Sequence, residues 1–424
     1  MDYSFSNLYL LLYIIAWIMT LLVHQKKNKS WGPGSIIILS YLIFGIISFL
    51  LYQNPSARRA YGSLSFFPFL YLYVALLISS LPIIKFDTYH IEHILPPSKK
   101  LLNYFSIIFI LISLTQIPSI VQNITSGMIS ILTDSDAGLE LYKENSGQGV
   151  SDGSISNIFA IVYNVVSPVS ILFLFFYLTL RKPNIIIIIG YGACVLIDLL
   201  SQLSRGLRTS TTLTAFTIII TYFAFKPFFT EKVKYYVKRI LLISFILVAI
   251  PFLAITISRF GSSDKGASSS LLSYMGMSTL NFNNYGLDAG GIRYGDRTST
   301  IFKQMLGMDT VTDFYEARFK YSHLKMDDSV FYTFIGDFTL DYGPVIAFVL
   351  FCVFSYIFCN STKPIYRTKT IPFYKLILLY FAMSVCMQGS MYLFSFSYTR
   401  NLVIIAMLLI YLVFYLDYKF YIKR

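Results

Sequence analysis

The chain has 424 residues and a formal net charge of +13, and 56% of its residues are hydrophobic. So apolar a composition indicates a membrane protein rather than a soluble one. The basic surplus does not indicate nucleic-acid binding, because it lies in short loops between apolar segments and there orients helices against an anionic leaflet. All four cysteines fall inside apolar segments, which argues against disulfides and thiolate metal sites.

Eleven apolar segments are each long enough, or nearly so, to cross a hydrocarbon core of about 30 Å. In chain order they are Phe5–Val23, Ser35–Tyr52, Leu64–Ile84, Leu101–Val121, Ile155–Leu180, Ile185–Leu203, Thr209–Phe225, Ile240–Ile257, Phe338–Cys359, Pro372–Phe394 and Asn401–Tyr418. These segments predict an all-α polytopic integral membrane protein with about eleven spans, forming a single transmembrane domain over residues 1–424.

The basic residues separate by side when the N-terminus is placed outside and the C-terminus inside. The predicted inner loops then hold 20 of the 34 basic residues and 4 of the 21 acidic ones. This distribution follows the positive-inside rule. The predicted location is therefore a cytoplasmic membrane, with the polar chemistry on the outer face.

Two long outer segments interrupt the pattern of spans and short loops, at residues 122–154 and 258–329. The second is far longer than a helix connection requires. Its apolar patch at Ile301, Phe302, Met305 and Leu306 predicts short helices at the outer membrane surface, closing over a cavity.

A polar group marks the outer end of the sixth span. Asp198, Gln202 and Arg205 are spaced i, i+4, i+7, and Arg208 follows three residues later. One interpretation is a structural pair of Asp198 with Arg205, with both arginines reaching the interface. The other is that the guanidinium groups bind an anionic ligand such as a phosphate.

Further arginines recur at predicted outer helix ends, namely Arg259, Arg293, Arg297 and Arg400. The stretch 290–297 reads Gly-Gly-Ile-Arg-Tyr-Gly-Asp-Arg, and its glycines and cations suit a loop that wraps a phosphate or sugar. The plainer alternative is a solvated turn in which Asp296 pairs with Arg293 or Arg297.

Candidate proton acceptors lie near the start of the ninth span and in the second outer segment. Asp337 is the leading one, ahead of Asp296 and His323. Asp341, one turn after Asp337, is alternatively an amino-terminal cap for the helix that contains Pro344. The other histidines lie in predicted inner loops, so we expect no histidine metal site, and Asp134-Ser-Asp136 is a weak match to a metal-binding carboxylate pair.

The chain resembles a family at this point. The chain is rich in aromatic residues and has about eleven predicted spans. Ser204-Arg205-Gly206 stands at an outer helix end, and Gly336-Asp337 is followed by Asp341-Tyr342-Gly343. In these features the chain is similar to the bacterial oligosaccharide repeat-unit polymerases, the Wzy-type O-antigen polymerases. The resemblance implies the membrane glycosyltransferase fold called GT-C and a substrate of undecaprenyl-diphosphate-linked oligosaccharides, both donor and acceptor. It places the reaction at the outer face of the bacterial inner membrane, in polysaccharide or lipopolysaccharide synthesis, and leaves room for a chain-length regulator as a partner.

The chemistry read from the residues agrees with that resemblance. A glycosyl donor outside the membrane must carry its own leaving group, and arginines can stabilise charge developing on a lipid diphosphate without a metal or cofactor. We expect Arg205 and Arg208 to bind it, with Arg259, Arg293, Arg297 and Arg400 as further contacts, while a carboxylate or His323 accepts the proton. Two rivals remain open: an O-antigen ligase, and a lipid-linked oligosaccharide flippase or other secondary transporter.

Overall fold

The computed structural model describes the chain except for residues 1–3, 123–154, 205–207, 245–265, 312–315, 317–318, 328–329, 388–397 and 423–424. Within the described part, nine helices are long and apolar enough to cross a membrane. This confirms the predicted helical, multi-pass membrane protein. Most of the predicted eighth span lies outside the described residues, and the tenth is described only as the shorter apolar helix α18 (Phe373–Met387).

The chain divides into two compact units, each assembled from separate stretches of sequence. Unit 1 comprises Met1–His90, Ser268–Lys363 and Leu378–Ile404, and unit 2 comprises Ile91–Ala267, Pro364–Ile377 and Ile405–Arg424. The division passes through α18 and through α19 (Tyr398–Asp417), so both helices contribute to both units.

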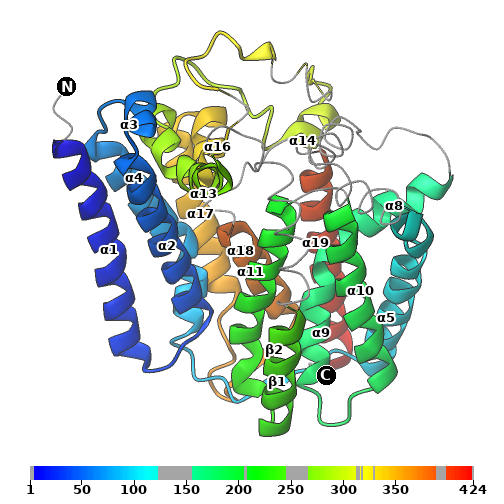
Figure 1. Ribbon diagram of the computed structural model, residues 1–424. Coiled ribbons are helices and arrows are strands. Elements are labelled where there is room, and N and C mark those ends of the chain that lie inside the picture. The colour runs from blue at the N-terminus through cyan, green and yellow to red at the C-terminus, as the bar shows by residue number, and fades with distance from the viewer. Residues whose placement is uncertain are drawn as a thin grey trace. The chain divides into compact units, whose positions relative to one another are not determined.

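Unit 1 is built on three mutually packed apolar helices, α1 (Ser4–Asn28), α2 (Pro33–Gln53) and α4 (Phe66–Phe86), as Figure 1 shows. Its core includes the fully buried Trp17, whose ring lies 5.0 Å from that of Tyr41 and 4.9 Å from that of Tyr73, measured between centroids. Close aromatic packing of this kind holds the three helices together where burial from water does not drive association.

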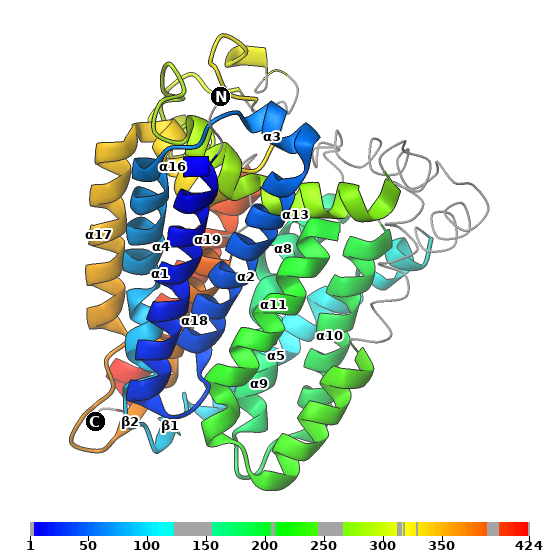
Figure 2. The same ribbon diagram turned by 60° about the vertical axis from the view of Figure 1, so that its left-hand side comes forward.

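The remaining helices of unit 1 are α3 (Pro55–Tyr61), α13 (Gly266–Tyr285), α14 (Thr300–Met305), α16 (Thr333–Tyr342) and α17 (Pro344–Ser361). Figure 2 shows α17 alongside α4. The predicted ninth span, Phe338–Cys359, is wrong at its start, because the helix is interrupted at Gly343. That glycine has φ of +80°, a left-handed conformation that only glycine adopts at little cost, and Pro344 then begins α17.

The two ends of unit 1 differ in their polar contacts. At one end the His24 ring nitrogen Nε2 lies 2.9 Å from Asp87 Oδ2, and Ser35 donates its backbone N–H to the same oxygen at 3.3 Å. His24 therefore lies buried in α1, not in an inner loop as the sequence predicted. At the other end Asn283 of α13 hydrogen-bonds both backbone groups of Ser65, at the start of α4. We call this second end the outer end of unit 1, following the predicted topology.

Unit 2 contains α5 (Lys99–Leu114), α8 (Ile155–Val166), α9 (Ser170–Leu178), α10 (Ile185–Ser204) and α11 (Arg208–Phe225). The short 3-10 turns η1 (Ser167–Val169) and η2 (Lys226–Phe228) adjoin α9 and α11. Its core is aromatic: the ring of Phe173 stacks on those of Phe105 and Tyr191, with centroids 4.9 and 5.6 Å away.

A short parallel strand pair departs from the all-α prediction. In unit 2, β1 (His93–Leu95) pairs with β2 (Thr370–Pro372). These strands join two loops that are far apart in the sequence, at the end of unit 2 that also carries Arg181.

Candidate functional site

A fully buried ion pair lies at the outer end of unit 1. The Arg293 Nε lies 2.8 Å from Asp341 Oδ1, and neither side chain has any exposed surface. The Arg293 Nη2 donates to the backbone carbonyl of Asp337 at 3.0 Å and lies 3.7 Å from the Asp337 carboxylate. Such charges are expensive to bury unless paired, and here the two segments that supply them hold each other in place.

The glycine-rich stretch 290–297 wraps the carboxylate of Asp341 from the same chain. Asp341 Oδ2 accepts hydrogen bonds from the backbone N–H of Arg297 at 3.1 Å, and from the backbone N–H and hydroxyl of Thr298 at 2.8 Å each. Gly295 makes this approach possible, since its φ is +80° and an added Cβ would lie 2.6 Å from Ser299 Oγ. The loop has the character predicted for an anion-binding turn, and an internal carboxylate occupies it.

The alternative role for Asp341 as an amino-terminal cap of the ninth span is wrong. Asp341 lies in the last turn of α16, and Gly343 occupies the cap position of α17. The turn at Gly343 separates the two helices, so the Asp341 carboxylate faces the loop and not the first turn of α17.

Asp296 has other partners than the arginines that the solvated-turn alternative proposed. Its carboxylate forms ion pairs with Lys303 and Lys320, the latter at 2.5 Å, and accepts a short hydrogen bond from the Tyr321 hydroxyl. Burial opposes ionisation of Asp296, but hydrogen bonds from Lys303, Lys320 and Tyr321 outweigh it and hold its pKa below the usual value. Burial, reinforced by Asp296, raises the pKa of Tyr321, so this phenol remains a donor.

Asn401 joins the start of α19 to the same loop. Its side chain donates to the Thr298 carbonyl at 2.8 Å and accepts from the backbone N–H of Ile301 at 3.1 Å, and it is fully buried. The adjacent Arg400 is partly exposed. Asn401 thus brings the helix end that carries Arg400 to the loop of Arg293 and Arg297, which are both buried, whereas Arg400 is partly exposed.

The other predicted site residues are described only in part. Asp198 accepts hydrogen bonds from Gln202 at 2.8 Å, confirming that the two share a helix face, and from Ser167 at 3.2 Å. Arg208 begins α11, and nothing is described of its side chain. His323 is exposed. Outside the described residues lie Arg205, Arg259, Asp134 and Asp136.

Most of the residues that complete this network had no signal in the sequence. Thr298, Lys303, Lys320, Tyr321 and Asn401 complete the network, but each is a common residue type in a polar segment. Only Asn401 had a usable clue, its position directly after Arg400 at a helix start. Within the described part of the chain, no group of three or more His, Cys, Asp or Glu side chains is placed to hold a metal ion.

The arrangement can hold the loop rigidly against the end of α16 and the start of α19. Arg293 and Arg297 lie inside the network, so a bulky anion has no direct access to them.

No family model matches this chain, and neither does any curated protein or solved structure.

Proposed function

We propose that this protein is a membrane glycosyltransferase that joins lipid-diphosphate-linked oligosaccharide repeat units at the outer face of a bacterial cytoplasmic membrane. The observation that carries the proposal is the Asn401 contact with Thr298 and Ile301, which holds the long outer segment against the helix end that bears Arg400. An ordered polar loop over the end of a helical bundle is what a lipid-linked substrate requires, because its headgroup is polar and its tail stays in the bilayer.

The cations divide into two roles in this proposal. Arg293 and Arg297 position the loop in this proposal, because both side chains are buried, Arg293 pairs with Asp341 of α16, and the Arg297 backbone N–H donates to the same carboxylate. Binding of the diphosphate falls to Arg205, Arg208, Arg259 and Arg400. Guanidinium groups suit this role, since they bind phosphate oxygens in a bidentate manner and stabilise the charge that develops as the diphosphate leaves.

The proton of the attacking sugar hydroxyl needs an acceptor that the sugar can reach. Of the three candidates, Asp337 is fully buried and Asp296 is neutralised by two lysines, whereas His323 is exposed in the outer segment. His323 is therefore the favoured acceptor, because a general base must come within hydrogen-bond distance of the proton it removes.

The test uses a strain from which this gene is deleted, complemented with variants, and reads the surface glycan as a gel ladder. Arg205→Ala and Arg400→Ala should reduce polymer synthesis about a hundredfold, as expected for loss of a group that stabilises leaving-group charge. Arg59→Ala, an exposed arginine in α3 of unit 1, is the matched control and should restore the full ladder.

The location of the accumulated intermediate separates the rival functions. A missing polymerase leaves single repeats outside the membrane, attached to their acceptor. A missing ligase leaves full-length polymer on the lipid carrier, and a missing flippase leaves single repeats on the inner leaflet. Polymer of normal length from both Arg205→Ala and Arg400→Ala would remove these arginines from the mechanism.

A further inference from the structure

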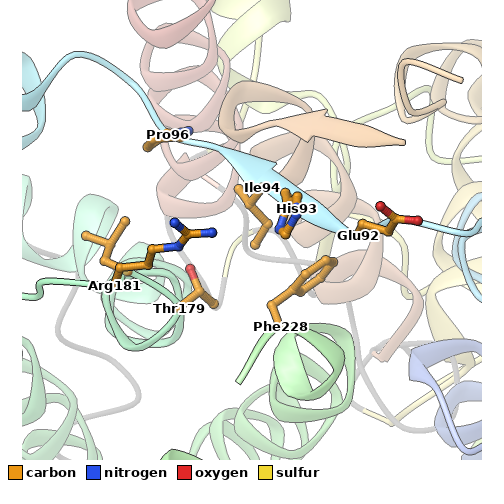
Figure 3. Close-up of a pocket in the computed structure, with 8 residues that line it drawn as sticks. Glu92, His93, Ile94, Pro96, Thr179, Arg181 and Phe228 are labelled. Carbon is orange, nitrogen blue, oxygen red and sulfur yellow. The ribbon is translucent and has the colours of Figure 1, made fainter. Parts of the chain in front are cut away.

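A pocket of about 400 Å³ opens in unit 2, on residues that the proposed glycosyl transfer does not use. It lies between β1, the chain leaving α9 and the turn η2, as Figure 3 shows. The predicted topology places it on the inner face of the membrane.

Two nitrogen-bearing side chains, those of Arg181 and His93, line this pocket. In Figure 3, the Arg181 guanidinium and the His93 ring come from opposite walls, one following α9 and the other from β1. Within the described residues, neither side chain makes a hydrogen bond or an ion pair. The one acidic residue in the lining, Glu92, is held by Lys369 at 2.7 Å. The pocket therefore presents a guanidinium group and an imidazole ring, while Lys369 offsets the charge of Glu92.

Apolar side chains also line the pocket, next to the ends of two candidate spans. Ile94, Leu180 and Phe228 contribute to the walls. One candidate span ends at Leu178, directly before the pocket, and another ends at Phe228 itself. A site at this level meets both the phosphate and the upper acyl chain of a phospholipid, and Lys226, two residues before Phe228, adds to its attraction for anions.

We propose that this pocket binds the phosphate of an anionic phospholipid headgroup, with Arg181 and His93 donating to the phosphate oxygens and Leu180 and Phe228 contacting the glycerol and first acyl carbons. The guanidinium fork fits phosphate oxygens in pairs. A soluble phosphate shares the headgroup chemistry but leaves the apolar walls unfilled. The lipid site is independent of the proposed glycosyl transfer.

The experiment measures binding to the full chain, purified in detergent, by native mass spectrometry and by the shift of melting temperature. The probes are short-chain phosphatidylglycerol, phosphatidylcholine with the same acyl chains, and inorganic phosphate. Phosphatidylglycerol should bind saturably and raise the melting temperature, and phosphatidylcholine should bind at least tenfold more weakly. Stabilisation by inorganic phosphate at similar concentration would assign the pocket to a soluble phosphate compound instead.

Variants show whether the binding belongs to this pocket. The double variant Arg181→Gln with His93→Gln should weaken binding of phosphatidylglycerol about tenfold or more, with the lipid-free melting temperature unchanged because both residues are exposed. Lys182→Gln, which removes the adjacent cation outside the lining, should change binding less than twofold. Equal binding by the double variant, or an equal loss in Lys182→Gln, would overturn the proposal. Polymer synthesis read in parallel keeps the two proposals separate.

Discussion

The Nε of Arg293 lies 2.8 Å from Oδ1 of Asp341, with both side chains fully buried. This contact joins the long polar segment that follows α13 to the last turn of α16. Because the partners come from separate segments, neither charge can remain buried if the loop detaches. The pair therefore makes the order of the loop and the fold of unit 1 depend on each other.

Removing one charge of this pair should destabilise the protein strongly. Asp341→Asn keeps the size of the side chain but leaves the buried Arg293 with only the more distant carboxylate of Asp337, 3.7 Å away. The expected cost is at the lower end of the range for a broken buried pair, about 3 kcal/mol. The measurement is the melting temperature of the purified protein in detergent.

The control for this variant is an exposed ion pair of the same outer segment. Asp288 and Lys325 lie 3.0 Å apart and are largely solvent-exposed. Asp288→Asn should leave the melting temperature unchanged, because exposed pairs contribute little. Equal melting of Asp341→Asn and the wild type would mean that the buried pair does not hold the loop.

The candidate proton acceptors should separate by their effects on rate and stability. His323→Gln should lower polymer synthesis about a hundredfold or more, as for loss of a general base, without changing the melting temperature, since the ring is exposed. Asp337→Asn should lower the melting temperature, because its carboxylate is buried beside Arg293. Full activity in His323→Gln would exclude the histidine as the base.

Acid should remove the stabilisation that Asp296 provides. Its lowered pKa means that folding favours the ionised carboxylate. That contribution is fully present above the unfolded-state pKa of about 4 and is lost as pH falls through the lower folded-state value. The melting-temperature gap between wild type and Asp296→Asn should therefore stay constant near neutrality and close below about pH 4.

The hydroxyl of Tyr321 provides an internal check on this acid response. Tyr321→Phe removes the hydroxyl that contacts both Asp296 and the Arg293 carbonyl, but keeps both lysines. The difference in melting temperature between Tyr321→Phe and Asp296→Asn should therefore be smaller than that between the wild type and Asp296→Asn, and it should close over the same pH range. A gap that widens on acidification would contradict the assigned direction of the shift.

At the end of unit 1 that contains His24 and Asp87, close helix packing should leave no room for a side chain at Gly34. A Cβ at Gly34 would lie 2.8 Å from the Ile84 Cα and 2.9 Å from Asp87 Oδ2. Gly34→Ala should therefore destabilise the protein by about 1–3 kcal/mol, as overpacking does. Gly192→Ala is the matched control, since no atom lies within 4 Å of its added Cβ inside α10. It should be neutral or slightly stabilising in a melting experiment, and equal destabilisation by both variants would contradict the packing argument.

The membrane helices were predictable because hydropathy is a local property. A run of about twenty apolar residues must be buried in lipid or protein wherever it lies in the fold, and only a helix satisfies its own backbone groups there. The helical, multi-pass character was therefore readable from composition and spacing alone. The break at Gly343 was missed because hydropathy continues across it, and the conformation of the glycine, not its polarity, ends the helix.

The partners of the charged residues depended on the tertiary structure. Nearest neighbours in sequence paired Asp296 with Arg293 or Arg297, whereas the fold pairs it with Lys303 and Lys320 and gives Arg293 to Asp341. Electrostatic pairing depends on distance and burial in space, and both are decided by how the loop closes onto α16 and α19. Composition thus established what kind of protein this is, while only the folded chain determined which cations are buried and which are partly exposed.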